Sequence, residues 1–484
     1  MLMGAAVVAG AVAVPAGFTL AQSDAAISNI NEIRTELEPN KGTKPLTAQP
    51  ADTEFTTAMP IPQVLAPSQA TAGVDSYAVD VGPATVQLIP GMSTPNALTF
   101  GGTFVGPTIR ATVGKPVQIT YTNNISDPIS VHLHGGHTPA DSDGYPMDLV
   151  QPGQSKTYTY PNNQQGCTLW YHDHAMGMEA EHVYYGLHGM YILDDPAEAG
   201  LGLPTGDADV PIMIRDVQLD EQGNFIWDIE GADNRNTILV NGISKPYFTV
   251  SARKYRFRLV NSANERVLTL SVNGGATFQQ IGSDGGLLPT PVSQTSLTLG
   301  SAERADIVVD FSQHAVGDQV MLSDVSGDLL RFDVVSAATD NSRVPAILRL
   351  LPPLGIPTVT RKVTMSMDFS TGQPVGMMNG AAFDPNVIDY YVKRGATEIW
   401  DVVNTDTEID HSFHIHLVQF RVLGRSGAPM QPDDIGLKDT IYLPRNTSVR
   451  VQATFRDYLG LYVFHCHYLE HSSLGMMGQY KVVD

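Results

Sequence analysis

Three strand-like segments with a shared frame recur along the chain. They are GKPVQITYTNN, ARKYRFRLVNS and RGATEIWDVVNT, which reach Asn123, Asn261 and Asn404 at intervals of about 140 residues. Valine, threonine and aromatic residues are frequent in the strand-like stretches, whereas long amphipathic helical stretches are few. A repeated unit of this length made of short strands predicts a Greek-key β-sandwich. We therefore expect an all-β chain that contains three such sandwiches.

Length and composition agree with three domains. The chain has 484 residues, of which 42% are hydrophobic and only 16% charged, as in globular proteins with large cores. We expect domains over residues 71–200, 201–355 and 356–484, preceded by an extended lead-in over 23–70. The formal net charge of −21 argues against nucleic acid as a partner and is compatible with cationic or neutral substrates.

Residues 1–22 predict an export signal. Their apolar run is interrupted at Pro15, is short for a membrane span and ends in TLA before Gln22, as at a signal cleavage site. No lysine or arginine precedes the run, which leaves two options: an atypical leader, or a twin-arginine leader that begins upstream of Met1. No other apolar run is long enough for a membrane helix. We expect a protein exported to the periplasm, the cell envelope or the exterior, without stable membrane insertion.

The spacing of the histidines indicates a metal cluster. Four His-x-His pairs occur, against roughly 0.4 expected by chance from 14 histidines. The pairs are His132/His134, His172/His174, His414/His416 and His465/His467. Residues two apart in a strand project from the same face, so each pair can direct two imidazoles at one cluster. Eight imidazoles suit about three metal ions. Only the first and third repeats carry these pairs, so we expect the middle domain to be a spacer that sets their geometry.

A second metal site is indicated around Cys466. In a strand, this cysteine faces away from the two histidines that flank it, and His411 likewise faces away from the cluster pair that follows it. His471 and Met476 follow Cys466 in what we expect to be a loop. A thiolate, two imidazoles and a weak axial thioether form the ligand set of a blue-copper site. Zinc also accepts thiolate and imidazole, but the thioether and the neighbouring cluster favour copper.

Two alternatives remain open at this second site. Met477 competes with Met476 as the axial ligand, although the spacing from the cysteine favours Met476. Cys167 is the only other cysteine, and in an exported protein it could form a disulfide with Cys466. If Cys466 is instead a metal ligand, Cys167 is expected to be a buried free thiol.

The motifs HLHG, HDH, HSFHIH and HCHYLEHSSLGMM resemble the four copper-binding motifs of the multicopper oxidases. HLHGGHTPADSDGYP and WYHDHAMG are most similar to bacterial spore-coat-type laccases and bilirubin oxidases. The resemblance spans nearly the whole chain that follows the predicted export signal. It implies three cupredoxin-like domains, four copper ions, one-electron oxidation of a small-molecule or metal-ion reductant, and four-electron reduction of O₂ to water. The ligands that it implies are His132 and His414 for the type 2 copper; His134, His172 and His467 for one type 3 copper; His174, His416 and His465 for the other; and His411, Cys466, His471 and Met476 for the type 1 copper.

The resemblance also implies catalytic roles beyond copper binding. Cys466 and its neighbours His465 and His467 would carry electrons from the type 1 site to the cluster. Asp143 matches an acidic residue near the type 2 copper, although it could simply cap the turn at Gly144. Bacterial relatives often have a glutamate directly after the type 1 histidine, where this chain has Ser472. We therefore expect Asp143 to carry most of the proton delivery.

Three functions are compatible with these motifs. The first is a laccase-like oxidase that acts on phenolic or aromatic amine donors. The second is a metallo-oxidase for Cu(I) or Mn(II), which the charge of −21 keeps open although no methionine-rich or histidine-rich insert is present. The third is a copper-free scaffold of the same fold, which is disfavoured because every ligand position is filled. Neither the physiological donor nor the oligomeric state is predicted.

Overall fold

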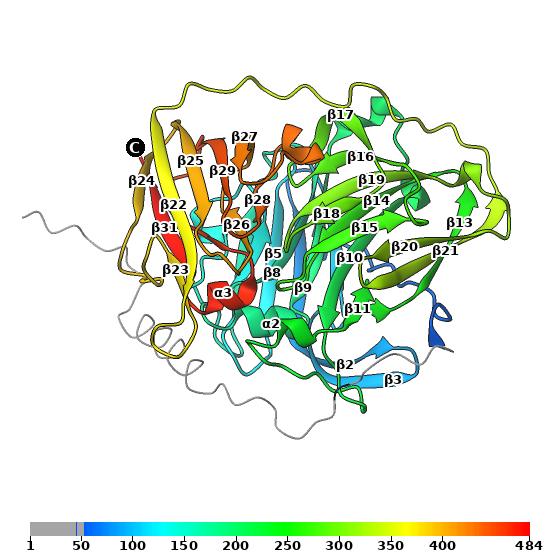
Figure 1. The fold of residues 1–484 in the computed structure, drawn as a ribbon, viewed down its shortest axis with the longest axis horizontal. Helices are drawn as coiled ribbons and strands as arrows, with labels where there is room; N and C mark the ends of the chain where they lie inside the picture. Colours follow the sequence, from blue (N-terminus) through cyan, green and yellow to red (C-terminus); the bar gives the residue numbers. More distant parts are fainter. Residues whose placement is uncertain (1–44, 46–52) are drawn as a thin grey trace, which may run out of the picture.

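The structure is a computed structural model that describes residue 45 and residues 53–484. The predicted export signal lies outside the described residues, as does the lead-in except for residue 45 and residues 53–70. The chain folds into three β-sandwiches, shown in blue to cyan, green, and yellow to red in Figure 1. No helix in the described part of the chain has the length and hydropathy needed to cross a bilayer.

The first sandwich contains a five-stranded and a four-stranded sheet. The five-stranded sheet consists of β1 (Gln69–Ala70), β2 (Asp75–Ile89), β5 (Val117–Asn123) and β7 (Ser155–Tyr160), with β3 (Met92–Phe100) paired to β2. The four-stranded sheet consists of β4 (Gly106–Thr112), β9 (His188–Asp194), β8 (Cys167–Asp173) and β6 (Val131–His134). Residues 53–68 run alongside the first two sandwiches and pair with them at two single bridges, Ala58 to Tyr247 and Val64 to Thr108.

The second sandwich contains a seven-stranded and a five-stranded sheet. The larger sheet consists of β12 (Ile243–Ser244), β11 (Thr237–Val240), β10 (Asp209–Val217), β14 (Lys254–Asn261), β19 (Arg304–Asp310), β16 (Phe278–Ser283) and β17 (Gly286–Gln294). The smaller sheet consists of β13 (Tyr247–Ala252), β21 (Gly327–Ala337), β20 (Gln319–Asp324), β15 (Leu268–Val272) and β18 (Leu297–Leu299).

The third sandwich contains two five-stranded sheets. One consists of β23 (Val375–Met378), β22 (Val359–Asp368), β25 (Thr397–Asn404), β29 (Ser448–Thr454) and β27 (Phe420–Ser426). The other consists of β24 (Tyr390–Lys393), β31 (Met477–Val483), β30 (Gly460–Cys466), β26 (His411–Ile415) and β28 (Thr440–Leu443). A segment of residues 338–358 without strands connects the second sandwich to the third and crosses the top of the molecule in Figure 1.

Helices are few and short, as expected from the sequence. The described residues contain two α-helices, α2 (Glu179–Tyr185) and α3 (Leu469–Ser473), which contact each other. The 3₁₀ turns are Ala140–Ser142, Pro196–Leu201, Gly206–Ala208, Ala232–Asn234, Phe311–Gln313 and Pro432–Ile435. The described chain is therefore mainly β, as the strand-rich sequence predicts.

The three sandwiches share one pairing pattern. In each of them an early strand pairs in parallel with the strand that carries the repeated segment: β2 with β5, β10 with β14, and β22 with β25. In each of them the opposite sheet also contains one parallel pair: β4 with β9, β13 with β21, and β24 with β31. Each sandwich also encloses its own hydrophobic core. The repeat in the sequence therefore corresponds to a repeat in topology.

The hydrogen bonds of the asparagine that ends each repeated segment explain why asparagine recurs at this position. The Asn261 side chain donates hydrogen bonds to the carbonyls of Arg266 and Leu299 and accepts one from the amide of Ala263. Asn123 and Asn404 make the same three kinds of bond in their own sandwiches. One side chain thus closes the turn after the strand and ties it to a distant segment, which a buried amide can do because it has both donors and an acceptor.

Candidate metal centre

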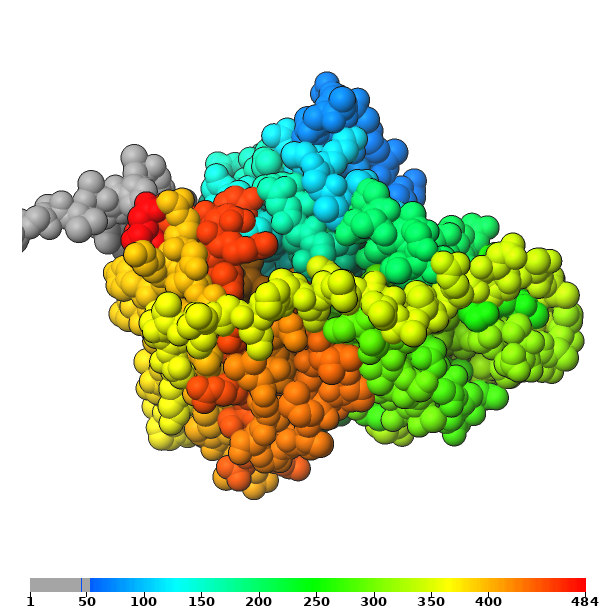
Figure 2. Space-filling view, turned by 90° about the horizontal axis from the view of Figure 1, so that it is seen from above, coloured from blue at the N-terminus to red at the C-terminus, as the bar shows by residue number. Residues whose placement is uncertain are grey.

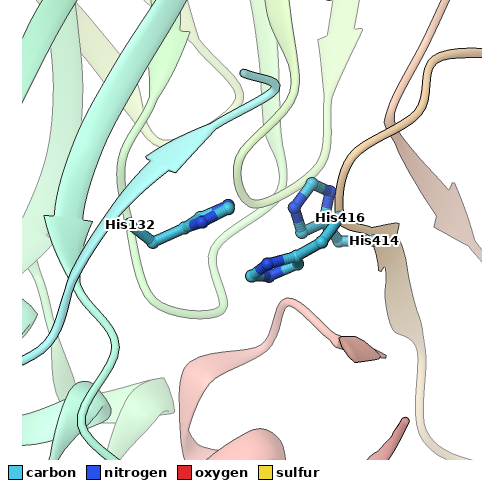
Figure 3. A group of neighbouring side chains, drawn as sticks. All are labelled: His132, His414 and His416. Atoms are coloured by element: carbon cyan, nitrogen blue, oxygen red, sulfur yellow. The ribbon is translucent and has the colours of Figure 1, made fainter. Parts of the chain in front are cut away.

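The four His-x-His pairs lie at the ends of four strands. The first pair is on β6, whereas each other pair has its second histidine just beyond the end of β8, β26 or β30. In the first sandwich His132 is directly opposite His172 on the paired strand, and in the third sandwich His414 is opposite His465. Two strand pairs from two sandwiches therefore present eight imidazoles to one another, and Figure 3 shows His132 facing His414 and His416 across this gap.

The imidazoles converge in groups of three, and the ligand nitrogens of each group lie within 4.8 Å of one another. The buried groups are His132, His414 and His416; His134, His172 and His467; and His174, His416 and His465. In the last group Nε2 of His465 lies 3.2 Å from Nε2 of His174 and 3.3 Å from Nε2 of His416. The two triplets expected from the family resemblance at the type 3 coppers are thus brought together, as are His132 and His414.

Backbone carbonyls set the direction of four of these eight rings. The Nδ1 atoms of four rings lie within hydrogen-bond distance of a main-chain oxygen: His132 of Asp143, His172 of Asp173, His414 of Asp439, and His465 of Cys466. Such a bond occupies Nδ1 and leaves Nε2 as the free ligand atom. The Nε2 atoms of His132, His172 and His414 are accordingly buried without a hydrogen-bond partner, and so is Nε2 of His467. Buried polar atoms without partners are unfavourable unless something else satisfies them.

His134 is oriented the other way round. Its Nε2 lies 2.8 Å from Thr440 Oγ1 and 3.1 Å from Asp439 Oδ1, so Nδ1 is the atom left buried and without a partner. Asp439 is held in turn by Arg304, whose guanidinium donates to both carboxylate oxygens at 2.6 and 2.5 Å. Asp439 lies 305 residues from His134 in the sequence, and Arg304 lies 135 residues from Asp439. The sequence therefore did not predict either contact. No local motif signals either contact.

The second sandwich therefore does more than separate the other two. Besides Arg304, it contributes Ser301, whose hydroxyl donates to the carbonyl of His467 at 2.8 Å. The carbonyl of Ser301 accepts a hydrogen bond from Ser412, which lies next to His411. We expected a spacer, and the structure shows direct contacts from this sandwich to residues of the cluster.

Carboxylates complete the surroundings of the cluster. Asp143 Oδ2 lies 2.6 Å from Nδ1 of His416, and Glu179 Oε2 lies 2.9 Å from Nδ1 of His174. Burial raises the pKa of Asp143 to about 7, against the lowering effects of His174 and Thr138. Asp143 is thus within reach of the cluster, as expected, and its contact with His416 is more than a cap of the turn at Gly144. Glu179, on α2, was not predicted.

Burial also keeps most of the cluster histidines neutral. Burial lowers the pKa of seven of the eight, and the neighbouring imidazoles lower it further. The pKa falls to about 3 for His172 and His465. The other five are His132, His134, His414, His416 and His467. At His174 burial also lowers the pKa, but the charge and hydrogen bond of Glu179 outweigh burial and raise it above the ordinary value. Neutral imidazole is the form that binds transition metals.

The residues expected at the type 1 site form a compact triangle. Sγ of Cys466 lies 3.6 Å from Nδ1 of His411 and 3.7 Å from Nδ1 of His471, and the two nitrogens are 3.1 Å apart. The point equidistant from these atoms is about 2 Å from each, the usual length of a metal–imidazole bond. Nε2 of His411 is bound by Asp406 at 2.9 Å, which leaves Nδ1 free. Burial raises the pKa of the Cys466 thiol, so the thiolate requires a bound cation.

Two expectations at this site are refined by the structure. His471 lies on the short helix α3 rather than in a loop, because residues 469–473 form one helical turn. Met476 follows that turn, and its backbone makes hydrogen bonds to two members of the triangle: its carbonyl accepts from the amide of Cys466, and its amide donates to the carbonyl of His471. Met477 points elsewhere, into a cluster with Tyr145.

The two cysteines are both buried and free. Cys167 lies at the start of β8, where Gln164 contacts its sulfur at 3.6 Å. The disulfide alternative is therefore wrong, and Cys167 is the buried free thiol that we expected.

The donor atoms fit copper. Five inward-facing imidazole nitrogens have no hydrogen-bond partner, two pairs of Nε2 atoms face each other at 3.2 and 3.3 Å, and a thiolate–imidazole triangle stands beside them. Facing imidazole nitrogens share at most one proton, but a metal ion between them satisfies both lone pairs. A trigonal His₂Cys set with an adjacent methionine is typical of copper rather than zinc.

Comparison with known proteins agrees with this chemistry. Family models described as multicopper oxidase match residues 82–198, 218–349 and 356–484. The chain is 36% identical to a laccase from Bacillus subtilis over 89% of this chain and 99% of that protein. It is 34% identical to a bilirubin oxidase from Albifimbria verrucaria over 88% of this chain and 81% of that one. A multicopper oxidase structure from Pediococcus acidilactici superposes with a TM-score of 0.83 at 30% identity, over 92% of this chain and 94% of that one.

The sandwich fold, the convergent histidines and these similarities lead to one conclusion. This chain belongs to the multicopper oxidases, copper-dependent oxidoreductases with cupredoxin-like domains and four copper ions that oxidise a donor and use O₂ as the acceptor.

Proposed function

We propose that this oxidase acts on phenolic or aromatic amine donors, as a laccase does. The observation that carries the proposal is the triangle of His411, Cys466 and His471 beside the cluster. Cys466 is the last residue of β30 and lies between His465 and His467 of the cluster. Bound copper supplies one-electron redox chemistry at the triangle and O₂ reduction at the cluster. The relatives named laccase and bilirubin oxidase support an organic donor.

We assign the copper ligands as the family pattern implies. The type 1 ligands are His411, Cys466 and His471, with Met476 as the axial ligand. The type 2 ligands are His132 and His414. The type 3 ligands are His134, His172 and His467 at one ion and His174, His416 and His465 at the other. The inward-facing nitrogens and the triplets described above support this assignment.

The donor would deliver electrons through His471. This residue is 8% exposed, whereas His411, Cys466 and Met476 are fully buried, so its ring is the part of the triangle nearest to solvent. Glu265 of the second sandwich lies beside it, with Oε1 3.8 Å from Nε2 of His471. Burial and the neighbouring Glu470 raise the pKa of Glu265 well above its ordinary value. A carboxyl oxygen of Glu265 can accept a hydrogen bond from a phenol or an aromatic amine in either protonation state and so hold the donor ring near His471.

The test is steady-state turnover of four donors by the copper-loaded protein: a phenol, bilirubin, Cu(I) and Mn(II). The proposal expects the phenol to be oxidised with the highest kcat/KM. It also expects Glu265→Leu to raise KM for the phenol more than it lowers kcat, because leucine cannot accept the hydrogen bond. Preferential turnover of Cu(I) or Mn(II) would establish the metallo-oxidase alternative instead.

We also propose that the protein is exported, on the basis of the apolar segment over residues 1–22. Fractionation of cells that produce the full chain would test this. Recovery of the protein only in the cytoplasmic fraction would contradict the proposal.

A further inference from the structure

A cavity of about 370 Å³ lies where the first sandwich, the connecting segment and the third sandwich meet. The first sandwich contributes Gly135, His137, Gln164 and Gln165 to its wall, the connecting segment contributes residues 352–355, and the third sandwich contributes the rest. Figure 2 views the molecule from this side, where the yellow connecting segment runs between the cyan residues of the first sandwich and the orange residues of the third. None of the proposed copper ligands lines this cavity. A volume of this size is in the range of small-molecule sites.

The charge of the lining differs from that of the whole chain. The chain carries 50 acidic against 29 basic residues, yet the lining contains two arginines, Arg421 and Arg456, and no aspartate or glutamate. Among the described residues, neither arginine has an ion-pair or hydrogen-bond partner for its guanidinium, unlike the paired Arg425 and Arg450 of the same sandwich. The nearby carboxylate of Asp457 is bound by His137 at 3.0 Å. Two unpaired guanidinium groups at one cavity in an acidic protein favour an anionic occupant.

A third donor is also available. The side-chain nitrogen of Gln419 is buried without a hydrogen-bond partner, while the oxygen of the same amide accepts from Gln165. The amides of the other glutamines at the cavity are already used: Gln164 donates to the carbonyl of Gly135 and Gln452 to that of Gly355. A buried N–H without an acceptor is unfavourable, and an anion in the cavity would supply one.

Apolar side chains form much of the remaining wall. Leu354, Pro352 and Pro353 of the connecting segment face Leu417, Val418 and Leu437 of the third sandwich around the cavity. An inorganic anion would leave these side chains against water, whereas an organic acid would cover them and gain from the burial of its own apolar surface. We propose that this cavity binds a small organic carboxylate, with the carboxylate at Arg421 and Arg456 and the apolar body against Leu354, Leu417 and Val418.

Such a ligand would bridge separately folded parts of the molecule. It would contact the connecting segment and the third sandwich, and at Gly135 it would reach the first. Ligands that bind only the folded state raise the unfolding temperature, and this one would do so at the seam between sandwiches.

The experiment uses the copper-loaded protein and sodium benzoate, with benzamide as the neutral isostere and sodium sulfate as the inorganic anion. Isothermal titration calorimetry and thermal unfolding are the readouts, and no donor is oxidised, so the result is independent of the proposed substrate class. We expect benzoate to bind and to raise the unfolding temperature, and benzamide and sulfate to bind about tenfold or more weakly.

Arginine variants test whether benzoate binds in this cavity. Arg421→Gln should weaken benzoate binding about tenfold, and so should Arg456→Gln, whose exposed side chain can be replaced without disturbing the core. Arg450→Gln, an exposed arginine on the same sandwich that pairs with Asp401, makes the same charge change outside the cavity and should have no effect. Absence of benzoate binding, equal affinity for sulfate, or binding that survives both cavity substitutions, as it would if benzoate bound at the copper ions, would each overturn the proposal.

Discussion

The second and third sandwiches have the same framework and different chemistry. Both contain the asparagine-ended strand, the same parallel pairings and a core of their own. After Asn404 the chain continues into β26 with its histidines, whereas after Asn261 it continues into β15, whose five residues LTLSV carry no metal-binding side chain. The third sandwich therefore holds proposed ligands directly, while the second contributes the contacts behind them.

What this difference teaches is that a domain without ligands can still set the geometry of a metal centre. Arg304 of the second sandwich is fully buried and donates hydrogen bonds to both carboxylate oxygens of Asp439 of the third, and Asp439 contacts His134 of the first. A chain of three residues thus links all three sandwiches at the cluster. The following predictions test how far the roles of the ligand-bearing and ligand-free sandwiches are separate.

The largest effect is expected from Cys466→Ser in the third sandwich. The substitution replaces the thiolate sulfur, through which a bound copper would be joined to the backbone between His465 and His467, with a hydroxyl that is a poor copper ligand. We expect complete loss of the blue absorption and of donor oxidation, measured by optical spectroscopy and turnover, while the cluster histidines still bind copper. Cys167→Ser, which alters the other buried free thiol, should retain both properties. Substantial turnover by the Cys466 variant would mean that electrons enter elsewhere.

Removal of the contact from the second sandwich should come next. Arg304→Gln leaves Asp439 buried without its main cation and removes one of the two cations beside Asp284, which should cost about 3–5 kcal/mol of unfolding free energy, measured by urea denaturation. Because Asp439 also orients His134, copper content measured by elemental analysis should fall as well.

Arg256→Gln is the matched control, since it breaks a buried ion pair with Asp306 in the same sandwich. It should destabilise the protein without loss of copper. Equal copper loss in the two variants would show that the second sandwich acts only through general stability.

Asp143→Asn tests the carboxylate that the first sandwich places beside His416 of the third. The amide keeps the shape of the side chain but cannot accept and release a proton in the same way. We expect reoxidation of the reduced enzyme by O₂ to slow about 100-fold, measured by stopped-flow absorption, with anaerobic reduction of the type 1 site unchanged. Asp141→Asn, two residues away and exposed, should leave both steps unchanged.

The three repeated asparagines allow a direct comparison of the sandwiches. Each alanine variant should lower the unfolding free energy by about 1–3 kcal/mol, because buried backbone groups lose their partners. Asn404→Ala should also weaken the blue absorption, since Asn404 holds the turn at Asp406, which orients His411. Asn261→Ala should leave the absorption unchanged. An equal spectral change in both variants would contradict the separation of roles.

The smallest effect is expected at the axial position. Met476→Leu should raise the reduction potential of the type 1 site, because a weak donor to oxidised copper is lost, and redox titration would measure this. Met477→Leu should change the potential little, since Met477 packs in the cluster of Tyr145 and Met147. The reverse ranking would transfer the axial role to Met477.

Local patterns explain why much of the fold and site could be predicted. Strands such as β14 and β25 follow from alternating apolar and polar residues, and the threefold architecture follows from segments that end in Asn123, Asn261 and Asn404. The opposite facing of Cys466 and its two histidine neighbours follows from the period of two in a strand. The helical turn that carries His471 was not predicted, because five residues carry too little periodicity to identify a helix.

The sequence by itself indicated which side chains face the histidine cluster and which face the site at Cys466. Strand geometry makes side chains alternate between two faces, and the spacing of the His-x-His pairs follows this period of two. Only the tertiary structure decided what surrounds those ligands. Asp439, Arg304, Glu265 and the unpaired Arg421 and Arg456 reach their places through sheet pairing and the packing of sandwiches against one another. Contacts between residues hundreds of positions apart depend on that packing, and no local pattern in the chain encodes them.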